Sequence, residues 1–164
     1  MLALRYVYVL ALVVWLGGMV VLGALVAPTT FEVLQAGAPD TGRVLAGEVF
    51  GSIVARFHYV AYAAGALMLV TLAAMRLLGP RPAGFAARAA LVAGMLAVAL
   101  YSGLIVLRRI DTVQQEAGGR VSRLSPTDAR RARFDELHRL STRLMLLNIA
   151  GALVLLLWEA RETR

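Results

Sequence analysis

The chain contains two histidines, His58 and His138, and each lies where an apolar segment begins. His58 is in the sequence VARFHYVAY and His138 is in FDELHRLST. Imidazoles from two helices can hold a haem iron inside a helical bundle. The pair is therefore a candidate site for haem b. The alternative is that both histidines suit the membrane surface without any ligand, because the imidazole is amphipathic.

Three arginines near the histidines could meet the acidic groups of such a ligand, because a guanidinium forms paired hydrogen bonds with carboxylates. They are Arg56, Arg139 and Arg143, and Tyr62 follows His58 by one helical turn. The alternative for Arg143, which is about one turn inside its apolar segment, is that its side chain extends to the headgroups.

A metal site has fewer candidate ligands. Asp135 and His138 lie on adjoining faces of one helix, so His58, His138 and Asp135 form the candidate metal set. A di-iron bundle needs two Glu-x-x-His motifs and two further acids, a pattern the sequence does not contain. The absence of cysteine excludes disulfides and thiolate chemistry. No nucleophile and base have a spacing that indicates an enzyme.

The composition indicates which elements must position these residues. Of the 164 residues, 60% are hydrophobic and only 16% are charged, and the mean hydropathy is +0.73. A soluble domain has about 45–50% apolar and about 25% charged residues. The net charge of +7 suits anionic lipid headgroups better than nucleic acid. We therefore expect a protein of the lipid bilayer that binds no nucleic acid.

Four segments are long enough to cross a bilayer, which requires about 20 apolar residues of helix. They comprise residues 6–27, 58–78, 89–107 and 140–158. Pro28 should end the first helix, and the short connector 79–88 should make the second and third spans antiparallel neighbours. The sequence predicts an all-α, integral membrane four-helix bundle forming a single domain over residues 1–164, with no visible internal repeat.

Two helices should extend beyond the bilayer. Apolar residues recur every fourth position before the second span, at Leu45, Val49, Ile53 and Phe57. This spacing predicts an amphipathic lead-in to helix 2. The sequence SPTD (125–128) predicts a helix start with Ser125 as N-cap. Helix 4 should therefore be long and extend out of the membrane, with Asp135 and Arg139 as an intrahelical ion pair.

An even number of spans puts both termini on one side of the membrane. Arg5 precedes the first span and Glu32 follows it, which favours cytoplasmic termini. A count of all arginines favours the opposite orientation. We expect a multi-pass protein of the cell membrane with cytoplasmic termini.

Three stretches together carry a resemblance over nearly the whole chain: WLGGMVVLGALVAPTTFEVL (15–34), AGEVFGSIVARFHYV (46–60) and RFDELHRLSTRLMLLNIAGALVLL (133–156). The sequence resembles a family of small four-span membrane proteins of unknown function, with a eukaryotic transmembrane relative linked to cisplatin resistance. The WLGG span is also similar to that of CopD-like copper-resistance proteins and HemJ-like protoporphyrinogen oxidases, a haem-binding group. Those proteins commonly have histidine in the first span, where this chain has Tyr6 and Tyr8.

Three functions are compatible with these observations. The first is a binding module that holds haem b or a metal between His58 and His138. The second is an accessory or structural subunit of a larger membrane complex, with no ligand of its own. The third is transport of small solutes or metal, which would require a homo-oligomer because four spans form only a thin pathway.

Overall fold

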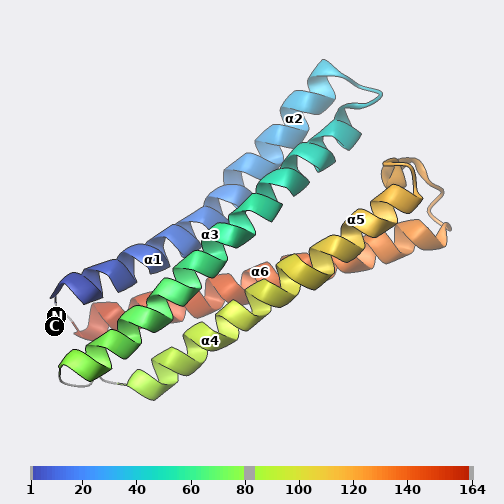
Figure 1. Ribbon diagram of the computed structural model, residues 1–164. Helices are drawn as coiled ribbons and strands as arrows, with labels where there is room; N and C mark the ends of the chain where they lie inside the picture. The colour runs from blue at the N-terminus through green and yellow to red at the C-terminus, as the bar shows by residue number, and fades with distance from the viewer. Residues whose placement is uncertain (1, 80–83, 163–164) are drawn as a thin grey trace.

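The computed structural model describes residues 2–79 and 84–162, and within them it contains helices and no strands (Figure 1). Four continuous helical rods are long and apolar enough to cross a membrane. The predicted all-α four-helix architecture is therefore confirmed. The chain folds as two helical hairpins that start at the same end of the molecule, where both termini lie.

The first hairpin consists of one interrupted rod and one long continuous helix. The interrupted rod comprises α1 (Leu2–Val21), the π-helix η1 (Leu22–Val26) and α2 (Ala27–Gly37). The chain then turns and returns as α3 (Gly42–Leu78). The predicted lead-in and the second span are thus one helix of 37 residues, about 55 Å long.

The prediction that Pro28 ends the first helix is wrong, because the rod continues to Gly37. A proline has no N–H, and its ring clashes with the carbonyl group of residue i−4 in a regular α-helix. Here the wider turn of η1 comes first: the Ala27 N–H donates to the carbonyl oxygen of Leu22, five residues back. Pro28 then occupies the first turn of α2, where a proline is tolerated.

The second hairpin repeats this organisation. Its interrupted rod comprises α4 (Phe85–Tyr101), the π-helix η2 (Ser102–Val106) and α5 (Leu107–Glu116). A connector containing the short 3-10 helix η3 (Val121–Arg123) leads to α6 (Ala129–Glu162). Residues 80–83, in the predicted short connector between the hairpins, lie outside the described residues.

The long fourth helix begins later than predicted. Asp128, not Ser125, is its N-cap, since a carboxylate oxygen of Asp128 accepts the N–H of Arg130 at 2.8 Å. The Ser125 hydroxyl lies 2.9 Å from the Thr127 hydroxyl instead, in the turn before the helix. The difference follows from competition between two capping side chains: Asp128 also forms an ion pair with Arg130 at 2.8 Å, which Ser125 cannot do.

The two hairpins bury equivalent positions. Five buried residues of the first rod have buried counterparts 80 residues later: Tyr8 and Arg88, Leu12 and Val92, Trp15 and Met95, Met19 and Ala99, Leu22 and Ser102. Between α3 and α6 the offset is 87 residues: Ala61 and Asn148, Ala64 and Gly151, Gly65 and Ala152, Met68 and Leu155, Leu72 and Glu159. The longer connector before α6 accounts for the difference between the two offsets.

The two hairpins therefore share one pattern of buried positions. α1 packs on α3 and α6, and α4 packs on α6 and α3, so exchanging the hairpins leaves the set of neighbours unchanged. The sequence shows no visible internal repeat, and this correspondence does not contradict that interpretation. The correspondence is hidden because it preserves burial rather than residue type, as Tyr8 and Arg88 illustrate.

The hairpins join at the end with the termini and part at the other end (Figure 1). The main core lies in the joined half and includes Trp15, Met68 and Leu155. In the parted half, α2 packs on α3, and α5 packs on α6 around a smaller core that includes Val113. No residue of α2 is buried. The Arg123 guanidinium donates to the backbone carbonyl oxygen of Asp40 and links the two tips.

Candidate functional site

His58 is half-buried and lies where the two hairpins begin to part. Its ring lies against Gly103, the second residue of η2, since a Cβ atom on that glycine would be 2.5 Å from the His58 Cδ2. The His58 Nδ1 is 2.9 Å from the carbonyl oxygen of Val54. The neighbouring Tyr62 hydroxyl donates to the carbonyl oxygen of Ala99 at 3.5 Å. His58 and Tyr62 therefore fill the space that the glycine of η2 leaves open.

His138 has a different environment. It is exposed, and its ring stacks on Phe134 with a centroid separation of 6.1 Å and an interplanar angle of 7°. At the position of η1 equivalent to Gly103, Gly23 meets Met145 of α6 instead. Met145 lies 87 residues after His58, so the methionine, rather than His138, takes the place of His58 in the second hairpin.

The two imidazoles are also at different levels along the bundle. The Arg88–Glu159 ion pair fixes one level of α4 against α6. Gly103, which His58 contacts, is 15 residues from Arg88, whereas His138 is 21 residues from Glu159. At 1.5 Å per residue, the two levels differ by about 9 Å. Among the described residues no group of three His, Cys, Asp or Glu side chains could hold a metal ion.

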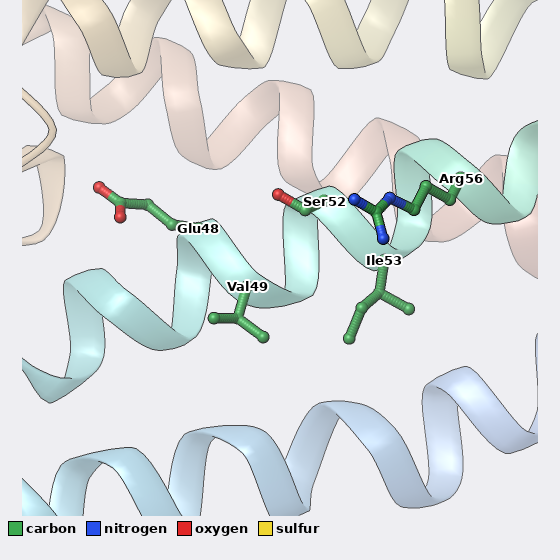
Figure 2. A pocket seen from close by; sticks show the side chains of 5 residues that line it. All are labelled: Glu48, Val49, Ser52, Ile53 and Arg56. Carbon is green, nitrogen blue, oxygen red and sulfur yellow. The ribbon is translucent and has the colours of Figure 1, made fainter.

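The arginines predicted to lie beside the histidines belong instead to polar stripes on α3 and α6, and we describe the stripe on α3 first. An open pocket of about 310 Å³ is lined by Glu48, Val49, Ser52, Ile53 and Arg56. In Figure 2, the side chains of Glu48, Ser52 and Arg56 lie on one side of α3, and those of Val49 and Ile53 on another. A Glu48 carboxylate oxygen would lie 3.8 Å from a Cβ atom on Gly119 of the second hairpin. The Glu48 end of this side therefore lies near the second hairpin, whereas Arg56 points away from it, because Arg56 is two residues from His58, which contacts Gly103.

A second polar stripe occupies the equivalent positions of α6. The offset of 87 residues relates Glu48 to Asp135, Ser52 to Arg139 and Arg56 to Arg143. All six side chains are exposed, and none has a hydrogen-bond or ion-pair partner in the part of the chain that the structure describes. The predicted pairing of Asp135 with Arg139 is therefore wrong. We call these two sets of side chains the equivalent stripes.

The spacing of arginines along the helices gives a measure of bilayer depth. Arg76 and Arg56 are 20 residues apart on α3, as are Arg88 and Arg108 on the second interrupted rod. Twenty helical residues span about 30 Å, the thickness of a hydrocarbon core. By this measure the stripe on α3 starts at the edge of the hydrocarbon, at Arg56. The four rods, of 32 to 37 residues, extend beyond it.

Comparison with known families gives one match. Residues 10–118, which are 109 of the 164 residues, match the domain of unknown function DUF4149. The protein belongs to the DUF4149 family. Comparisons with curated proteins and with solved structures gave no match. The DUF4149 segment includes both π-helices, the α3 stripe and Arg88, and it ends before α6.

One polar cluster was missed by the sequence reasoning. Glu159 of α6 is buried and binds two arginines: its Oε1 accepts from Arg88 Nη1 at 2.5 Å, and its Oε2 accepts from Arg5 Nε at 2.9 Å. The Arg88 guanidinium also lies 5.3 Å from the centre of the Trp158 ring. The signal that could have found this cluster was the position of Arg88 and Glu159, each close to the end of an apolar segment.

Proposed function

We propose that this integral membrane protein is a binding module for phospholipid, whose headgroups bind the equivalent stripes on α3 and α6. The observation that carries the proposal is the pair of equivalent stripes, whose polar side chains have no partner in the described residues. A guanidinium binds a phosphate through short, charge-assisted hydrogen bonds. Arg56, Arg139 and Arg143 supply three guanidinium groups close to the level where lipid phosphates lie.

The surroundings of the stripe on α3 support an amphiphile over a soluble anion. Val49 and Ile53 line the same pocket as Ser52 and Arg56, so apolar surface adjoins the polar stripe. The stripe also lies beside the exposed apolar faces of the rods, which contact the acyl chains. A lipid can therefore place its phosphate against the arginines while its chains remain in the hydrocarbon.

Lipid retention after purification tests this proposal. Native mass spectrometry of the protein from a mild detergent should detect bound phospholipid, and the double variant Arg56→Gln/Arg143→Gln should lose most of it. The matched control is Arg76→Gln/Arg161→Gln, which removes two exposed arginines at the other end of the bundle, far from both stripes. Equal lipid retention in both double variants would contradict the proposal.

Haem binding between His58 and His138 stays a prediction, and the different surroundings of the two imidazoles do not favour it. The same purified sample tests it, because a bound haem gives a Soret absorption band. A Soret band that disappears in a His58→Ala variant would support haem over the phospholipid. The accessory-subunit alternative predicts a second protein, and no retained lipid, after mild solubilisation.

A further inference from the structure

The side of α3 that faces the second hairpin carries two glycines in the parted half of the molecule. Gly51 and Gly47 precede His58 by 7 and 11 residues, which are about two and three helical turns, so all three residues lie on one side of the helix. On that side His58 contacts Gly103 of η2. In the described parts of the chain, however, no atom of the second hairpin lies within 4 Å of a Cβ atom on Gly51 or Gly47. The second hairpin therefore faces this side of α3 without packing on it.

Contacts between the hairpins lie at both ends of this unpacked stretch. Toward the termini it ends where His58 contacts Gly103. Toward the tips, long side chains bridge the hairpins: a Glu48 carboxylate oxygen would lie 3.8 Å from a Cβ atom on Gly119, and the Arg123 guanidinium reaches the turn between α2 and α3. Because these two side chains are long and flexible, they can keep their contacts over a range of distances between the helices.

The second hairpin has the parts that a movement toward α3 requires. Its first rod is interrupted by η2 at the level of His58, and helices can change direction at π-turns. Beyond η2, α5 packs on α6 around a small core of its own, separate from the main core of the joined half (Figure 1). The outer half of this hairpin can therefore move as a unit, with the rod changing direction at η2 and the long α6 bending gently.

We infer that the outer halves of the two hairpins close on each other, so that α5 packs on the glycine side of α3. Small residues let two helices approach closely, and Gly47 and Gly51 provide such a surface. Closure gives this surface the van der Waals contacts that it lacks while the hairpins are parted. Arg56 lies on the opposite side of α3, so the movement is independent of the proposed function.

Distances between spin labels test the closure. The full-length protein in phospholipid nanodiscs would carry labels at Leu45→Cys on α3 and Glu116→Cys on α5, two exposed positions that lie 13 residues beyond His58 and Gly103, respectively. Double electron–electron resonance should give two distance populations, one of them several ångströms shorter than the other. The longer distance corresponds to the parted hairpins, and the shorter distance corresponds to the closed ones.

A pair of neighbouring substitutions identifies the contacting surface. Gly51→Leu adds a side chain that fits the parted hairpins but overpacks the closed ones, so the shorter population should fall about tenfold. Gly47→Leu, one turn farther out on the same side, should have the same effect and is the second test if Gly51→Leu does not fold. The matched control Ser52→Leu adds the same side chain at the next residue, on the outer side of α3, and should keep both populations.

Two results would overturn the inference. A single long distance that Gly51→Leu does not change would show that the hairpins stay parted. Equal loss of the shorter population in Gly51→Leu and Ser52→Leu would show that the glycine side of α3 is not the surface on which α5 packs.

Discussion

Arg88 and Glu159 form a buried ion pair across 71 residues of sequence, with 2.5 Å between Nη1 and Oε1. The equivalent positions in the first hairpin are Tyr8 and Leu72, which are buried and carry no charge. The second hairpin thus uses an ion pair where the first uses uncharged side chains. Arg5 joins the pair from α1 and ties the end of α6 to the first hairpin.

Removing the carboxylate should destabilise the bundle strongly. Glu159→Leu takes the anion away from two arginines, one of which is buried, and loss of one member of a buried pair costs about 3–5 kcal/mol. The unfolding midpoint in detergent measures the effect. The double variant Arg88→Tyr/Glu159→Leu copies the first hairpin and should recover most of the loss, because well-packed uncharged residues can replace a buried ion pair. A double variant as unstable as the single one would contradict the equivalence of the hairpins.

The glycine of η2 should tolerate no side chain. In Gly103→Ala the new methyl group would meet the Tyr62 hydroxyl and the His58 ring, and such overpacking costs about 1–3 kcal/mol. Gly94→Ala is the control, because nothing lies within 4 Å of a Cβ atom there and alanine favours a helix. Thermal unfolding of both variants measures the difference. If the two variants were equally stable, His58 would not fill the space over Gly103.

Single cysteines can map the membrane limits, since the natural chain has none. Gly37→Cys and Ser122→Cys lie in the parted half beyond the hydrocarbon and should react with a membrane-impermeant maleimide. Leu67→Cys and Leu153→Cys, which are exposed on the bundle surface at mid-depth, should not react. With cytoplasmic termini, as the sequence predicts, the first two should react in intact cells. If these two cysteines reacted only after lysis, the termini would lie on the opposite side of the membrane, but the predicted membrane limits would still hold.

The first turn of α6 should lose stability at low pH. Hydrogen bonds from Arg130, first its side chain and then its backbone N–H, lower the pKa of Asp128 from 3.8 to about 2. The carboxylate therefore stabilises the first turn fully above about pH 4, and this contribution is lost as the pH falls towards 2. Hydrogen exchange of the first-turn amides should accelerate over that range. The same pH dependence in Asp128→Asn would show that another group is responsible.

Much of the fold was predictable because lipid imposes simple rules on length and polarity. Apolar segments of about 20 residues must be helices in a bilayer, and all four were found from the sequence. The continuation through Pro28 could not be predicted, because it depends on the wide turn of η1, whose hydrogen bond leaves no mark in the sequence. The late start of α6 depends on a similarly local choice between Ser125 and Asp128.

Part of the candidate site was visible in the sequence. The sequence singled out Arg56, Arg139, Arg143 and Asp135 because they lie near a span boundary. Their arrangement in two equivalent stripes was not predictable. That arrangement requires the offset of 87 residues, which becomes visible only when burial is known. The different levels of the two histidines could not be predicted from the sequence, because they depend on the longer connector before α6.

Photo-cross-linking in native membranes tests the central claim most directly, that the equivalent stripes bind phospholipid headgroups. A photoreactive amino acid would replace Ser52 or Arg139 in the stripes, and Val33 of α2 or Thr112 of α5, which are exposed, would serve as controls. The account predicts phospholipid adducts, detected by mass, from positions 52 and 139 at several times the yield from positions 33 and 112. Equal yields at all four positions, or no adduct from positions 52 and 139, would contradict it.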